Sequence, residues 1–237
     1  MRNGRWITQA ESSTCLSEAV AIWMRDLKGE FRTRYAVNAI LMFAFTTLIA
    51  VSFSIGSYRI VEAQKPFLNA VLLWIILVFS ALSGLSRSFV REEESGTMDI
   101  LKLSARPQAV FLGKLFFNLT LLGALEIIIV PSFVLLMGYE IKLPVCFWAM
   151  IISAGLGLGA GTTLVAAMIA QASARGALFS ALSFPLLLPL MITAIKGCER
   201  AALGLDAAGW PEVRIAVAYV VIMMVMSIFL FPLIWEE

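Results

Sequence analysis

The sequence predicts an all-α integral membrane protein with six transmembrane helices. Hydrophobic residues make up 60% of the 237 positions, and only 14% are charged, against about 25% in soluble domains. The mean hydropathy is +0.90. The apolar residues form six long runs, each near the ~20 residues that a helix needs to cross a bilayer. The charged residues lie mainly between these runs, as expected when each run is a span.

Before the first run, the sequence predicts a separate region, residues 1–35, made of a loose tail and an amphipathic helix. From Leu16 to Tyr35, bulky apolar residues recur every three or four positions, which is the period of a helix. We expect this helix to lie in the membrane surface, with its apolar side in the acyl boundary. The alternative is a soluble helix packed on a partner. Its basic side carries Arg25, Lys28, Arg32 and Arg34.

Residues 36–237 form the predicted transmembrane domain. Its spans are residues 36–58, 67–85, 110–137, 145–169, 177–195 and 213–235, with a longer link at 196–211. Lys and Arg occur about twice as often on the side that holds the amino-terminal region as on the other side. By the positive-inside rule, this bias places both termini in the cytoplasm.

Residues 91–107, between the second and third spans, are densely charged. Three consecutive carboxylates must lie in water or at a protein interface, because one charge costs about 3 kcal/mol or more at the centre of a bilayer. The residues after them predict a short helix that begins at a threonine and has an apolar edge. Such a helix suits docking to a soluble partner; the alternative is a solvated loop that only sets the topology. The docking residues would be Glu92, Glu93, Glu94, Gly96, Thr97, Met98, Asp99 and Leu101.

Glu126 is a carboxylic acid well inside the third span, and Pro131 follows five residues later. An intramembrane carboxylate is a candidate for function, because its cost must be offset by a partner or by protonation. The alternative is a protonated Glu126 that braces helix contacts by a hydrogen bond. Its partner would be Asn118 or Thr120 of its own helix, or a neighbouring serine.

Pro185 and Pro189 lie four residues apart in the fifth span. Each removes a backbone hydrogen bond, so we expect the helix to be kinked or broken there. A broken helix can line a cavity or act as a hinge, but transmembrane helices also tolerate proline for packing alone.

Four glycines alternate with other residues in the fourth span, at Gly155, Gly157, Gly159 and Gly161. Their spacing superficially resembles a dinucleotide-binding loop, but they lie in an apolar run with no preceding strand. The pairs 155/159 and 157/161 are small-xxx-small patterns, which let helix backbones approach closely. We therefore interpret them as packing residues.

The sequence contains no soluble-type active site. It has no phosphate-binding loop and hence no ATPase motif of its own, so we do not expect an enzyme. Its three cysteines show no CxxC spacing, which gives no indication of a metal site or a redox pair. The net charge of +2 gives no reason to expect nucleic-acid binding.

Six short motifs occur in order between residues 68 and 200. They are EESGTMDIL at 93–101, ARP at 105–107, FLGK at 111–114, GLGLGAG at 155–161, RG at 175–176 and FPLLLPL at 184–190. The first is shared with many permeases of ABC export systems. Its combination with the proline-rich fifth helix resembles the CcmB family, the permease subunits of the cytochrome c maturation (haem exporter) system.

The resemblance implies a permease subunit in the bacterial inner membrane, whose complex couples ATP hydrolysis to haem trafficking and to release of the haem-loaded chaperone CcmE. The implied partners are the ATPase subunit CcmA, with two copies of each of the two subunits, together with CcmC, CcmD, CcmE and membrane lipid. In that system CcmC and CcmE carry the haem chemistry and CcmA binds ATP, so we expect no cofactor on this chain alone. The absence of histidine agrees, since histidine is the commonest axial haem ligand.

Two other functions fit the residues. One is an ABC permease that exports a lipid or another amphiphile. The other is a proton-coupled carrier that uses Glu126 and needs no ATPase.

Overall fold

The computed structural model describes residues 15–56, 64–85, 96, 106–169 and 175–236. These residues form seven helices and no strand. Six of the helices are long and apolar enough to cross a membrane, which confirms the predicted all-α class with six spans. The helices are α1 (Cys15–Thr33), α2 (Tyr35–Gly56), α3 (Lys65–Leu85), α6 (Pro107–Met137), α7 (Pro144–Ile169), α8 (Arg175–Leu203) and α9 (Asp206–Glu236).

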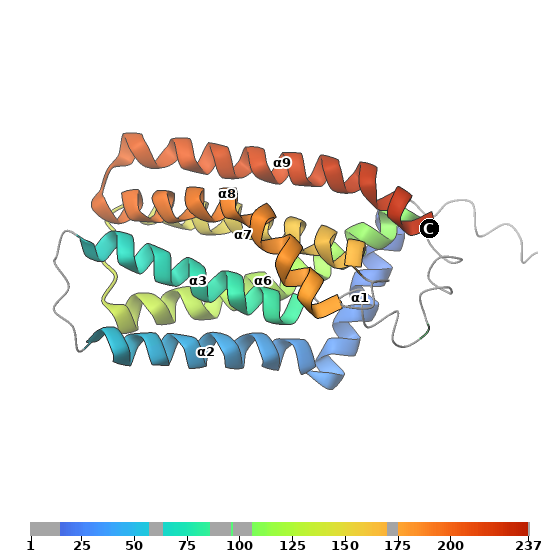
Figure 1. Ribbon diagram of the computed structural model, residues 1–237, viewed down its shortest axis with the longest axis horizontal. Coiled ribbons are helices and arrows are strands. Elements are labelled where there is room, and N and C mark those ends of the chain that lie inside the picture. The colour runs from blue at the N-terminus through green and yellow to red at the C-terminus, as the bar shows by residue number, and fades with distance from the viewer. Residues whose placement is uncertain (1–14, 57–63, 86–95, 97–105, 170–174, 237) are drawn as a thin grey trace, which may run out of the picture.

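The six spans run side by side, and α1 crosses one end of the bundle (Figure 1). Helix α7 is central and contacts α3, α6, α8 and α9. Within an apolar stretch of 18 residues in α7, 83% of the residues are buried, against 17% in the corresponding stretch of α2 and 22% in that of α9. Helices α2 and α9 are therefore peripheral, and most of their apolar side chains are open to lipid. Helix α9 ends near α1, so both described chain ends lie at one end of the bundle (Figure 1).

The chain turns from α1 into α2 at Arg34, which adopts a left-handed φ of 52°. This conformation is uncommon for a residue with a Cβ. The buried Glu30 supports the turn, because its carboxylate accepts a hydrogen bond of 3.0 Å from the backbone N–H of Val37. A carboxylate at a helix start satisfies a free N–H group and opposes the positive end of the helix dipole.

At the other end of the bundle, α6 stops at Gly138, whose φ of 58° is a common way to end a helix. The following Tyr139 is buried, and its hydroxyl donates a hydrogen bond of 3.1 Å to the carbonyl oxygen of Cys198 in α8. Burial, with smaller contributions from Cys198 and Glu199, raises the pKa of Tyr139 above its ordinary value. The phenol therefore stays a neutral donor that ties the α6–α7 turn to α8.

The predicted link at 196–211 is wrong. Helix α8 continues to Leu203 and α9 begins at Asp206, so only a tight turn around Gly204 separates them. The prediction ended the fifth span at the first charges, because charges are costly in hydrocarbon. In the structure these charges lie on the continuing helices, where Arg200 of α8 forms an ion pair with Glu212 of α9. The helices thus extend past the apolar runs.

Candidate functional site

The predicted docking segment lies almost entirely outside the described residues. This applies to Glu92, Glu93, Glu94, Thr97, Met98, Asp99 and Leu101, so their docking role stays a prediction. Gly96 is described and has a φ of 66°, a left-handed conformation that favours glycine. Helix α3 ends and α6 begins at the end of the bundle that α1 crosses (Figure 1). The segment therefore leaves and re-enters the described structure at this end of the bundle.

Helix α6 begins at Pro107, a residue suited to the first helical position. Its first turns pack closely against α1. A methyl group added at Gly113 would lie 2.8 Å from the Cβ of Ile22 and 2.9 Å from the carbonyl oxygen of Ala19. Ala19 and Ile22 are buried. The absence of a side chain at Gly113 therefore brings the two helices into contact.

A buried ion pair joins the same two helices. The Lys114 Nζ lies 2.7 Å from the Asp26 Oδ2, and the two side chains are only 3% and 11% exposed. Arg25 adds a second contact to the same carboxylate, at 2.8 Å, but its side chain is 47% exposed. This pair was not predicted from the sequence. Two features of the sequence could have indicated it. Asp26 is an acid on an amphipathic helix and Lys114 is a base near the start of an apolar span, and each needs an opposite charge when it is buried.

Two further hydrogen bonds extend the contact. The indole N–H of Trp23 donates to the hydroxyl of Thr120 at 3.0 Å. The backbone N–H of Arg106 donates to the Glu18 carboxylate at 3.3 Å. Helix α1 thus contacts α6 over a stretch that begins at Arg106, the residue before α6, and ends in the fourth turn of α6 at Thr120.

Only part of the predicted apolar stripe of α1 forms this contact, through Trp23. Leu16, Val20 and Phe31 are exposed, whereas Ala19 and Ile22 face α6. The exposed stripe is compatible with a membrane surface, and that location of the helix stays a prediction.

We expect Gly113→Ala to destabilise the contact between α1 and α6, because the Cβ of Ile22 and the carbonyl oxygen of Ala19 leave no room for the methyl group. Overpacking of this kind costs about 1–3 kcal/mol. The measurement is the unfolding of the purified chain in detergent. Gly123→Ala on the same helix is the matched control, since a Cβ there meets nothing within 4 Å. Equal stability of the two variants would contradict the close approach.

Glu126 lies at the interface of α6 and α7, where its carboxyl group packs on Gly155. Its Oε1 is buried and makes no hydrogen bond within the described part of the chain. The predicted bond to Asn118 or Thr120 is wrong. Asn118 donates to Thr163 at 2.8 Å, and Thr120 donates to the carbonyl oxygen of Phe116 at 2.7 Å. The physical reason is distance, because residues eight and six positions away are about 12 and 9 Å along the helix.

The glycines of α7 lie on two of its faces. Gly155 and Gly159 face α6, where they meet Glu126 and Leu119. Gly157 and Gly161 face α8 and α9, where they meet leucines of α8 and Tyr219. This arrangement is what the small-xxx-small interpretation requires, because each pair admits a different neighbour.

Pro185 and Pro189 both lie on the exposed side of α8. The helix runs through them without interruption and bends along its length (Figure 1). Whether they line a cavity or act as a hinge stays a prediction. Pro131 is likewise exposed on a continuous α6.

The described residues contain no group of three or more His, Cys, Asp or Glu side chains that could hold a metal ion. Cys146 and Cys198 are buried and form no disulfide bond, and Cys198 accepts a hydrogen bond of 3.3 Å from the Trp74 indole. We therefore interpret both cysteines as packing residues.

A helical bundle with six spans, a glycine-lined central helix and a transverse amino-terminal helix defines a multi-pass membrane protein. The CcmB family model, described as CcmB protein, matches residues 17–234. The chain therefore belongs to the CcmB family. It is a membrane permease subunit of the haem exporter complex of cytochrome c maturation, an ABC transporter complex with an ATPase partner, and is not itself an enzyme. A search among curated proteins gave no match.

Proposed function

We propose that this permease couples ATP hydrolysis by CcmA to release of haem-loaded CcmE, through residues 91–107 and α1. The observation that supports this most is the buried ion pair between Asp26 and Lys114. It joins α1 to α6 about two turns after α6 begins. A segment bound by an ATPase partner would pull on the start of α6, and α6 and α1 would move together.

The contact from Arg106 to Glu18 supports the same route. Arg106 is the residue at which the chain returns from the docking segment, so a displacement there acts directly on α1. The close packing of α1 on α6 at Gly113 would pass this displacement from one helix to the other, since packed helices shift as units.

In this proposal the protein lies in the bacterial inner membrane with both termini in the cytoplasm. Two copies act with two copies of CcmA, alongside CcmC, CcmD and CcmE. The exposed apolar surfaces of α2 and α9 leave room for a second copy as well as for lipid. Haem is handled by the complex, and this chain, which lacks histidine, holds none alone.

The test of the proposal is the pair Met98→Asp and Leu101→Asp. Buried apolar anchors at an interface each contribute about 2 kcal/mol or more, about thirtyfold in the dissociation constant. We therefore expect the double variant to insert normally but to lose CcmA in co-purification and to lose the complex's ATP hydrolysis.

The control is Glu93→Gln, which should weaken association only slightly and mainly at low salt, because rim charges are screened. Full recovery of CcmA with the double aspartate variant would mean that this segment only sets the topology.

The proposed orientation of the protein in the membrane can be tested by labelling two positions. Thr33 and Glu140 are exposed and lie at opposite ends of the bundle. In a cysteine-free background, Thr33→Cys should be labelled only from the cytoplasmic side, and Glu140→Cys only from outside. The measurement is labelling of intact cells with a membrane-impermeant thiol reagent, with permeabilised cells as the control. Labelling of both positions in intact cells would contradict the proposed orientation.

A further inference from the structure

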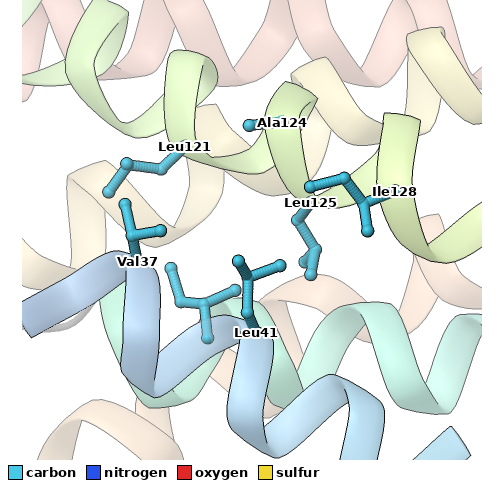
Figure 2. A pocket seen from close by; sticks show the side chains of 7 residues that line it. Val37, Leu41, Leu121, Ala124, Leu125 and Ile128 are labelled. Carbon is cyan, nitrogen blue, oxygen red and sulfur yellow. The ribbon is translucent and has the colours of Figure 1, made fainter. Parts of the chain in front are cut away.

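A groove on the outer surface runs between α2 and α6 (Figure 2). The side chains of α2 and α6 point toward each other across it, and all of them are apolar. Its volume is about 70 Å³. It is lined by Val37, Ile40, Leu41, Leu121, Ala124, Leu125 and Ile128.

The size and chemistry of the groove exclude a haem-sized ligand. Small-molecule sites usually enclose about 300–1,000 Å³ and carry a few polar groups. This groove is several times smaller, has no polar side chain, and opens outward at the exposed Ala124 and Ile128. It suits a segment of one aliphatic chain that lies along the protein.

Cations lie at the head of the groove. Val37 begins its lining three residues after Arg34, and Leu41 is about 10 Å along the helix from that corner. Arg34 is exposed, as are Lys28 and Arg32, which are one helical turn apart on α1. An acyl chain in the groove would therefore place its headgroup near these three residues.

The acids around this corner do not cancel the positive charge. The Glu30 carboxylate is buried and accepts the Val37 N–H. The Asp26 carboxylate is paired with Lys114 and Arg25. The exposed side of the corner thus carries an excess of cations beside an apolar groove, which is a combination that recognises anionic lipids.

We propose that the groove and this corner bind one glycerophospholipid with an anionic headgroup, in the leaflet on the α1 side of the membrane. The acyl chain lies between α2 and α6, and the phosphate contacts Arg32 and Arg34. The proposal goes beyond the transport function, because a bound lipid would brace α2, α6 and α1 where they meet.

The test is native mass spectrometry of the full-length chain, purified in mild detergent and titrated with phosphatidylglycerol or with phosphatidylcholine of the same acyl chains. We expect the wild type to bind one phosphatidylglycerol at least tenfold more tightly than phosphatidylcholine. Arg32→Gln and Arg34→Gln should each lower phosphatidylglycerol affinity about fivefold and leave phosphatidylcholine unchanged.

Ala124→Phe fills the groove and should weaken binding of both lipids at least tenfold. The matched controls are Ala218→Phe and Arg214→Gln, at exposed positions of α9 away from the groove, and they should bind like the wild type. Equal affinity of the wild type for the two lipids, or unchanged binding by Ala124→Phe, would overturn the proposal. If Ala124→Phe turned a dimer into a monomer while lipid binding stayed unchanged, the occupant would be a second copy of the chain.

Discussion

Asp26→Ala is expected to lower the free energy of unfolding by about 3–5 kcal/mol, because it leaves the ammonium of Lys114 buried without its carboxylate. The two groups are 2.7 Å apart, and the lysine side chain is only 3% exposed. The closely packed Gly113 next to it prevents α1 from moving aside to admit water. The loss should therefore appear as detachment of α1 from α6.

The measurement is thermal or denaturant unfolding of the purified chain in detergent, together with proteolysis of α1 in the membrane. Arg25→Ala is the matched control, because its half-exposed side chain makes a contact with the same carboxylate that is worth at most about 1 kcal/mol. The double variant Asp26→Leu with Lys114→Met should recover most of the stability, since an apolar pair can replace a buried ion pair.

Unchanged unfolding of Asp26→Ala would show that the ion pair does not hold α1 in place. The route from residues 91–107 through α1 would then lose its main support. Low stability of the double variant would instead mean that shape, and not charge, is what the pair provides.

The sequence predicted the spans well because length and apolar composition are local properties. A run of about 20 apolar residues has only one stable form in hydrocarbon, which is a helix with all its backbone groups bonded internally. The ends of the spans were predicted less well where a charge was paired. The charges of Arg200 and Glu212 suggested a link between two spans. In the structure the two side chains form an ion pair, so each charge is compensated and the helices continue through these positions.

The candidate site was harder to predict, because its contacts join residues far apart in the chain. Asp26 and Lys114 are 88 positions apart, and neither shows in its own segment that the other is near. In the sequence, Gly113 appeared only within the FLGK motif at 111–114. Its role depends on how closely α1 approaches α6, and that is a tertiary property. The α7 glycines could be interpreted from sequence because their four-residue spacing is itself the packing signal.

Glu126 is the position where substitution by lysine should have the largest effect within the membrane. Its carboxyl group packs on Gly155 and forms no ion pair with another described residue. An ammonium group there would cost about 2.5–3.5 kcal/mol or more, and the longer side chain would press on the α7 backbone. We expect Glu126→Lys to reduce the amount of protein in the membrane severely. Glu140→Lys, in the exposed α6–α7 turn, should not.

Glu126→Gln distinguishes a packing role of this residue from a role in proton-coupled transport. Glutamine has nearly the same shape as a neutral glutamic acid and keeps its capacity for hydrogen bonds, so a packing role predicts normal membrane levels and normal cytochrome c maturation. A proton-coupled carrier would need the acid itself, because glutamine cannot release a proton. Loss of maturation in Glu126→Gln at normal membrane levels would contradict the packing role and favour proton handling. Co-purification of CcmA with the same variant then decides whether the ATPase is still coupled, since a carrier of that kind requires none.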